Sequence, residues 1–196
     1  MTTTLRELNG LSDTPASLSN ATLILVDYQN TYTQGVMELE GWEGALNNAK
    51  NLLADARAAG TNIIHVVHDG GQGSPYDVNA EIGQIHSSVA PIDGESIIVK
   101  KAPDSFVGTD LGEKVDAIGN NNVIIIGFMT HMCVTFTAQG AFLRGNHATV
   151  VADACATRAL QTSVSEVSAL NLHSSALATI NDLYAVVVPS AAELSD

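Results

Sequence analysis

The chain has 196 residues, of which 45% are hydrophobic, so a single domain with a sizeable core is expected. Its 21 acidic residues outnumber its 8 basic residues, which gives a formal net charge of −13 at pH 7. Such a surface repels nucleic acid and anionic membranes. We therefore expect neither of them as a partner and expect a small-molecule substrate instead.

The N-terminal segment is polar and predicts an arm over residues 1–20, ahead of one domain over residues 21–196. It lacks the charged start and the long apolar stretch of a signal peptide, and no later run reaches membrane-spanning length. A cytoplasmic protein is therefore expected. In a reducing compartment Cys133 and Cys155 are expected to be free thiols rather than a disulfide.

Short β-branched runs alternate along the chain with segments of helical length. The runs occupy residues 22–27, 62–68, 96–100, 122–128, 148–153 and 183–188. Their near-continuous apolar character is typical of strands covered on both faces of a sheet. Apolar residues from Ala45 to Ala56 repeat at helical spacing, and Gly60 stands where that helix would end. A similar repeat from Leu160 to Leu177 predicts a helix before the last strand.

This order of elements predicts an α/β fold, namely a Rossmann-like doubly wound sheet of about six parallel strands with helices on both faces. Ligands of such sheets bind beyond the carboxyl ends of the strands, where the strand order reverses. Asp27 ends the first run, Lys100 ends the third, and Cys133 follows the fourth at the predicted start of a helix. Each has a structural alternative, as a cap, a surface charge and a small hydrophobic residue respectively.

Four segments together resemble the isochorismatase-like cysteine hydrolases, which include nicotinamidases, N-carbamoylsarcosine amidohydrolase and streptothricin hydrolase. These segments, which occur in order between residues 22 and 188, are LILVDYQNTY, GESIIVKKAPDSF, GFMTHMCVTFTAQGA and VVADACAT. The resemblance implies a Rossmann-like sheet and an Asp-Lys-Cys triad formed by Asp27, Lys100 and Cys133. It also implies a cis peptide bond at Phe128–Met129 and a homodimer or larger homo-oligomer.

The chemistry expected of this triad is nucleophilic hydrolysis. A helix N-terminus and a nearby ammonium are expected to lower the pKa of Cys133 and favour its thiolate. Asp27 then acts as the base that takes the thiol proton, and Lys100 holds the carboxylate. The backbone N–H groups of Met129 and Cys133 are expected to hold the oxyanion, because the first N–H groups of a helix lack intrahelical acceptors.

Further residues are candidates for contact with the substrate, namely Gln29, Tyr32, Trp42, Phe106 and His131. Gln29 lies two residues beyond Asp27 and reaches the pocket if the strand continues, or else ties down the loop. For Tyr32 and Trp42, a role in the core or at a helix start is equally open. His131 is a pocket-wall candidate, although neighbours in sequence at a helix start usually point apart. Thr130 is interpreted as the N-cap of that helix.

No metal or other cofactor is expected. Nicotinamidases of the resembled family bind a metal through an Asp-x-His motif, whereas Asp69 is followed here by Gly70 and Gly71. His65 and His68 are separated by an odd spacing, so they face opposite sides of a strand.

The presence of Cys133 favours cleavage of a C–N bond in an amide, lactam or carbamoyl compound through a thioester. Hydrolysis of another bond, as in isochorismatase itself, remains an alternative. So do a thiol-redox protein that uses Cys133 and a binding scaffold without catalysis.

Overall fold

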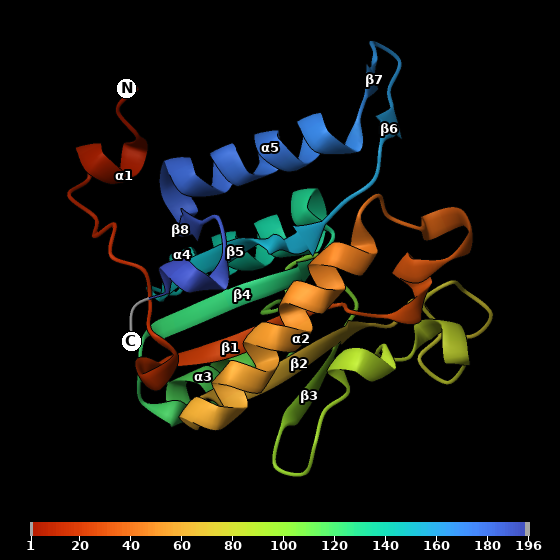
Figure 1. Cartoon of the computed structure of the whole chain (residues 1–196), viewed down its shortest axis with the longest axis horizontal. Coiled ribbons are helices and arrows are strands. Elements are labelled where there is room, and N and C mark those ends of the chain that lie inside the picture. Colours follow the sequence, from red (N-terminus) through yellow and green to blue (C-terminus); the bar gives the residue numbers. More distant parts are fainter. Residues whose placement is uncertain (1, 195–196) are drawn as a thin grey trace.

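A six-stranded parallel sheet forms the centre of the computed structural model, which describes residues 2–194 (Figure 1). Its strands are β1 (Ala21–Val26), β2 (Asn62–His68), β3 (Ser96–Lys100), β4 (Asn122–Phe128), β5 (His147–Ala156) and β8 (Ala185–Val188). They lie in the order β3-β2-β1-β4-β5-β8, so the strand order reverses between β1 and β4. The predicted fold class is confirmed. The two ends of the predicted arm and domain, residue 1 and residues 195–196, lie outside the described residues.

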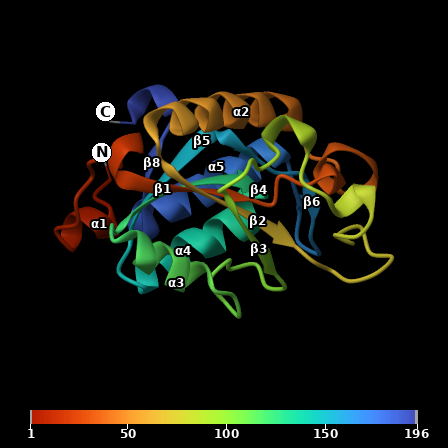
Figure 2. The ribbon, with the colours of Figure 1, turned by 90° about the horizontal axis from the view of Figure 1, so that it is seen from below.

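Helices cover both faces of this sheet. The helices are α1 (Leu5–Leu8), α2 (Trp42–Ala59), α3 (Leu111–Ile118), α4 (Thr135–Leu143) and α5 (Ala169–Thr179), and π-helical turns span Thr130–Val134 and Ile180–Tyr184. Short 3₁₀ turns occur at Leu18–Asn20, Asn30–Thr33, Gly35–Met37, Glu81–Gly83, Ser87–Val89 and Ala191–Glu193. Figure 2 shows α2 on one side of the sheet and α3 and α4 on the other. Since both faces are covered, every residue of β1 is buried, which explains why the strand is almost entirely apolar.

The helix predicted from the apolar repeat at residues 45–56 is confirmed and is longer than that repeat. Its buried face consists of Ala45, Leu46, Ala49, Leu52, Leu53 and Ala56. Burying each leucine contributes roughly 1.5–3 kcal/mol to folding. Gly60 ends the helix in the left-handed conformation with a φ of 72°, which glycine adopts without steric cost.

The helix predicted over residues 160–177 is wrong in its first half. The chain there forms a two-stranded antiparallel hairpin of β6 (Leu160–Gln161) and β7 (Glu166–Val167), and α5 begins only at Ala169. The Thr162 hydroxyl accepts hydrogen bonds from the N–H groups of residues 164 and 165, which offers the backbone a turn in place of a helix. Val164 is 91% exposed, so its apolar spacing does not mark a buried face.

The N-terminal segment packs against the end of the chain that holds α5 and β8 (Figure 1). Arg6 in α1 is buried, and its guanidinium donates to the carbonyls of Leu183 and Ser12 and pairs with Asp13. The strand predicted over residues 183–188 begins later, at Ala185, because a π-helical turn extends α5. None of the helices over residues 2–194 has the length and apolar character that crossing a bilayer demands.

Candidate active site

The residues singled out at the strand ends meet at one rim of the sheet. Asp27 directly follows β1, Lys100 ends β3, and Cys133 lies in the π-helical turn after β4. The Lys100 Nζ atom lies 2.8 Å from Asp27 Oδ2 and 3.2 Å from Cys133 Sγ. Asp27 and Cys133 follow the two strands between which the strand order reverses, so the cluster lies at the topological switch point.

This cluster is almost completely removed from solvent. Asp27 and Lys100 are 0% exposed, and Cys133 is 6% exposed. Burial raises the pKa of Asp27, and the nearby ammonium of Lys100 opposes that rise. Burial alone would lower the pKa of Lys100, but attraction to Asp27 and Cys133 outweighs it and the pKa is raised. Lys100 is therefore a cation that stabilises negative charge on either neighbour.

The electrostatics of Cys133 differ from the sequence-based expectation. Burial raises its pKa to about 12, and the carboxylate of Asp27 adds to this rise while Lys100 opposes it. The expected lowering is wrong because desolvation of the thiolate outweighs the attraction of the ammonium. The resting residue is a neutral thiol, so it requires a base before it can attack.

Two backbone features bring Asp27 to the rim. Asp27 has a φ of 54°, a left-handed conformation that aspartate tolerates better than most residues, and its carbonyl accepts the N–H of Gln29 at 2.8 Å. Beside it, Gly127 in β4 has a φ of 150°, and a Cβ there would lie 2.1 Å from the Val26 carbonyl oxygen. Only glycine lets β1 and β4 approach this closely just before Asp27.

The turn that carries Cys133 is π-helical rather than the first turn of an ordinary α-helix. The N–H groups of Met132 and Val134 both donate to the Met129 carbonyl, and Met129 is the N-cap. The peptide bond Phe128–Met129 is cis, as predicted. Thr130 is not the cap, because its hydroxyl is 2.8 Å from Nδ1 of His173 on α5. That contact anchors the turn to α5.

Two polar substrate-contact candidates, Gln29 and His131, have side-chain atoms that are engaged within the protein. The Gln29 amide donates to the carbonyls of His68 and Gly83 and accepts the N–H of His68. This buried side chain ties two loops together, which is the alternative that the sequence left open. Nδ1 of His131 lies 2.6 Å from Oγ1 of Thr157, so the ring is held against the end of β5.

The three aromatic candidates, Tyr32, Trp42 and Phe106, lie in different surroundings. Tyr32 is buried, and its pKa is raised well above the usual value by burial and by the charges of Asp27 and Cys133, so it lies near the cluster. Trp42 is the first residue of α2, and its ring centroid is 6.2 Å from that of His86. The ring of Phe106 is covered by the guanidinium of Arg144, 5.4 Å from its centroid.

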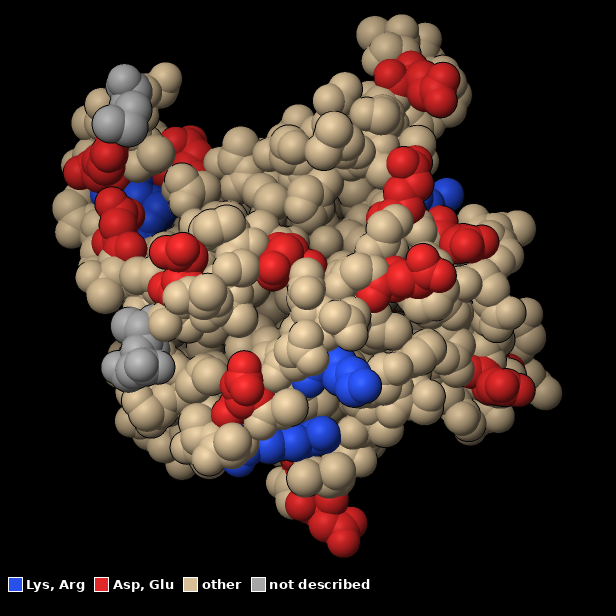
Figure 3. Space-filling view, viewed as in Figure 1, with Lys and Arg blue, Asp and Glu red and all other residues tan. Residues whose placement is uncertain are grey.

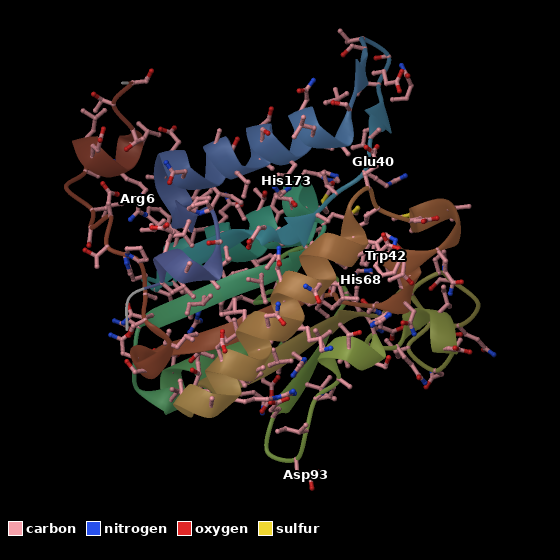
Figure 4. The ribbon with its side chains drawn as sticks, in the orientation of Figure 1. Arg6, Glu40, Trp42, His68, Asp93 and His173 are labelled. Atoms are coloured by element: carbon pink, nitrogen blue, oxygen red, sulfur yellow. The ribbon has the colours of Figure 1, made fainter. Side chains whose placement is uncertain are left out.

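Two further side chains, His68 and Tyr76, lie beside the cluster. His68 is the last residue of β2, and its Nδ1 lies 3.5 Å from Lys100 Nζ. The ring of Tyr76 packs edge-on against His68, with the centroids 5.1 Å apart. Figure 4 shows His68 at the end of β2 and Trp42 at the start of α2. His68 ends a strand, so the strand-end rule alone already points to it, whereas no pattern marks Tyr76 in its loop.

The reaction is predicted to be independent of metal ions. Among residues 2–194, no group of three His, Cys, Asp or Glu side chains is placed to hold one. His65 pairs with Glu95 on the far side of β2 from Lys100, and Asp69 accepts the N–H of Gly71. Incubation with EDTA followed by gel filtration should leave the turnover rate unchanged. A loss of activity that added Zn²⁺ or Mn²⁺ restores would contradict this prediction.

Comparison with known proteins agrees with this architecture. An isochorismatase domain model matches residues 21–192. The uncharacterized isochorismatase family protein YddQ of Bacillus subtilis is 38% identical over 168 residues, which cover 84% of this chain and 93% of YddQ. The ureidoacrylate amidohydrolase RutB of Agrobacterium fabrum is 28% identical over 160 residues, covering 63% of this chain and 70% of RutB.

The crystal structure of an isochorismatase from Pseudomonas putida KT2440 superposes with a TM-score of 0.96 at 36% identity, covering 100% of both chains. The similarity therefore extends over all the elements that carry Asp27, Lys100 and Cys133. The domain match, the relatives and the fold agree, and the chain belongs to the isochorismatase family of hydrolases.

Proposed function

We propose that the chain is a cysteine hydrolase that cleaves a C–N bond of a small amide, lactam or carbamoyl compound through a thioester on Cys133. The observation that carries this proposal is the position of Lys100 Nζ, 2.8 Å from Asp27 and 3.2 Å from Cys133, in a site closed to solvent. A base, a cation and a thiol in mutual contact form the arrangement that activates a nucleophile.

The first step of the proposed reaction moves a proton. Asp27, whose pKa is raised by burial, is a stronger base than an ordinary aspartate and takes the proton of the Cys133 thiol. The cation of Lys100 stabilises the thiolate that forms. Because the pKa of Cys133 is about 12, the thiolate forms only transiently and is a strong nucleophile.

The second step forms a bond between Cys133 Sγ and the substrate carbon. The oxyanion accepts hydrogen bonds from the backbone N–H groups of Met129 and Cys133 at the start of the π-helical turn. The tetrahedral intermediate collapses, the C–N bond breaks, and Asp27 returns its proton to the leaving nitrogen. Water, deprotonated by Asp27, then attacks the thioester and releases the acid and the thiol.

The name of one relative supports cleavage of a C–N bond. RutB is named an amidohydrolase, and it aligns over most of its length with this chain. Hydrolysis of another bond, as the name isochorismatase describes, is the alternative. A buried thiol held 3.2 Å from a lysine favours covalent catalysis by Cys133 over that alternative.

The test of this proposal is a panel of small amides, lactams and carbamoyl compounds assayed for the release of ammonia, an amine or a carboxylic acid. At least one member is expected to be hydrolysed with a burst of the first product, because acylation precedes hydrolysis of the thioester. Acid quenching during turnover should leave the acyl group on the peptide that contains Cys133. Hydrolysis without any adduct on Cys133 would contradict the covalent mechanism.

The homo-oligomeric state and the cytoplasmic location stay predictions. Both cysteines are free thiols in the structure, which agrees with a reducing compartment. Acidic side chains outnumber basic ones on the face shown in Figure 3, which agrees with a small-molecule substrate rather than nucleic acid.

A further inference from the structure

Two adjacent residues of the turn that carries Cys133 are held by side chains from outside the turn. Oγ1 of Thr130 lies 2.8 Å from Nδ1 of His173 on α5 (Figure 4). Nδ1 of the next residue, His131, lies 2.6 Å from Oγ1 of Thr157, which directly follows β5. The turn is therefore tied both to α5 and to the end of β5, two segments that follow it in the chain.

The contact with His173 satisfies a buried hydroxyl. Thr130 is 0% exposed, and its carbonyl accepts both the N–H and, at 2.7 Å, the hydroxyl of Thr135. Within residues 2–194, the Thr130 hydroxyl makes its hydrogen-bonding contact with His173. A buried polar group that loses its partner is unfavourable. Removal of the imidazole is therefore expected to shift the turn until this hydroxyl finds another partner.

Contacts from outside matter to this turn because its own hydrogen bonds are not those of a regular α-helix. The N–H groups of Met132 and Val134 both donate to the Met129 carbonyl, at 3.0 and 3.3 Å. In an α-helix each carbonyl accepts the N–H group four residues ahead, and π-helical turns are rare departures that often occur at functional sites. Side chains on neighbouring elements thus contribute to holding Cys133 Sγ at 3.2 Å from Lys100 Nζ.

We propose that His173 is a positioning residue of the hydrolase, a proposal that rests on the function proposed above. Its imidazole acts through the Thr130 hydroxyl and fixes the turn that presents Cys133 to the other two residues of the triad. Thr130 lies three residues before the nucleophile and directly after Met129, whose N–H group is a proposed oxyanion donor. A shift of Thr130 therefore moves both groups, and a misplacement of about 1 Å lowers a rate by about 10²-fold.

The surroundings of His173 allow a direct chemical test. The side chain is half-buried and borders a cavity of about 420 Å³ that is lined by α2, the end of β5 and the start of α5. Thr157, the partner of His131, lines the same cavity. The cavity is open to solvent, so a small molecule can reach the space that a shorter side chain at position 173 leaves beside Thr130.

The experiment compares variants that differ in where they place a polar atom. The side-chain amide in His173→Asn reaches the position of Nδ1, whereas the longer side chain in His173→Gln extends past it toward the position of Nε2. His173→Leu and His173→Gln should lower kcat by about 10- to 100-fold with KM almost unchanged, because the contact orients the reacting groups. His173→Asn should retain most of the wild-type kcat. Imidazole added to His173→Gly should restore part of the lost kcat.

A double variant tests whether His173 acts through Thr130. Thr130→Val removes the hydroxyl and keeps the shape of the side chain, so it should lower kcat about as much as His173→Leu does. Thr130→Val combined with His173→Leu should cost little more than either change alone, because both remove the same contact. Multiplication of the two losses in the double variant would show that His173 does not act through this hydroxyl.

Hydrogen exchange of the peptide that spans residues 129–135 measures the turn without any turnover. His173→Leu should speed exchange in this peptide, and His173→Asn should not. Ala178→Gly is the matched control, because it weakens α5 at an exposed position and should change neither exchange in the turn nor kcat. Thermal unfolding checks that every variant is folded at the assay temperature.

The outcomes separate this proposal from the proposed function. Faster exchange in the turn of His173→Leu, together with no hydrolysis of any amide by the wild type, would count against the C–N hydrolase alone. Unchanged exchange in the turn would overturn the role of His173, and so would a wild-type kcat in His173→Leu. A loss that neither His173→Asn nor imidazole reduces would also overturn it, because the contact with Thr130 would then not be the cause.

Discussion

Cys133→Ala is expected to lower turnover by about 10⁴-fold or more, because it removes the atom that forms the thioester. The matched variant Cys155→Ala is expected to retain activity. Cys155 is 5% exposed, and its Sγ donates to the Val151 carbonyl at 3.4 Å. Burial raises its pKa to about 12, and no lysine or arginine opposes this rise. Steady-state kinetics on both variants, with thermal unfolding as the check on folding, measures the difference.

The similar pKa values of Cys133 and Cys155 decide which experiment can distinguish the two thiols. Burial raises both pKa values to about 12, so simple alkylation near neutral pH does not separate them. Detection of an acyl adduct during turnover does separate them, because only Cys133 contacts Asp27 and Lys100. If substitution of either cysteine abolished function, the result would favour a thiol-redox protein over a cysteine hydrolase. An active Cys133→Ala protein would remove Cys133 from the mechanism.

Asp27→Asn is expected to lower kcat by about 10²–10⁴-fold, since the amide keeps the shape of the side chain and cannot accept the thiol proton. The substitution also leaves Lys100 buried without its counter-ion, 2.8 Å from a neutral group. Removing one partner of a buried ion pair costs about 3–5 kcal/mol of folding free energy. A lower midpoint of thermal unfolding is therefore expected beside the loss of activity.

A double variant separates catalysis from stability. Asp27→Asn combined with Lys100→Met removes both charges, which is often neutral for stability when a buried pair is replaced. It should regain stability while remaining inactive. Asp153→Asn is the matched control, because Asp153 lies in β5 at an exposed position and contacts neither Lys100 nor Cys133. A folded Asp27→Asn protein with near-normal kcat would contradict the proposed base.

The pH profile tests the same residue without mutation. Only the ionised form of Asp27 is a base, so activity falls as pH falls through its pKa. Burial raises that pKa above 3.8, and the acid limb of kcat/KM should therefore lie above pH 3.8. On the alkaline side, the pKa of Cys133 near 12 keeps the thiol protonated, and no limb from this group is expected near neutral pH. An acid limb below pH 3.8 would assign the base to another group.

The strands and the rim were predictable because both depend on residues close together in the chain. A strand covered on both faces needs consecutive apolar residues, and β2, β3 and β4 begin and end where their apolar runs do. Parallel strands place their carboxyl ends together, so Asp27 and Lys100 were expected at one edge. The resemblance to a family added the Asp-Lys-Cys grouping and the cis bond at Phe128–Met129, and the catalytic roles stay predictions.

Residues 160–167 show where local pattern was insufficient. The spacing of Leu160, Val164 and Val167 fits one face of a helix, but nothing packs on Val164, which is 91% exposed. Hydrogen bonds from the backbone to Thr162 then stabilise a hairpin instead. Apolar spacing predicts a helix only when tertiary contacts bury that face.

The sequence by itself determined the family, the doubly wound sheet and the residues delivered to its rim, because each follows from local order along the chain. The tertiary structure alone decided the state of those residues. Burial has a larger effect on the pKa of Cys133 than the nearby ammonium has. The Gln29 amide donates its hydrogen bonds to the carbonyls of His68 and Gly83. The buried Nε atom of Arg158 has no hydrogen-bond partner among the described residues. Desolvation and pairing depend on groups brought together from distant segments, and no local pattern records those distances.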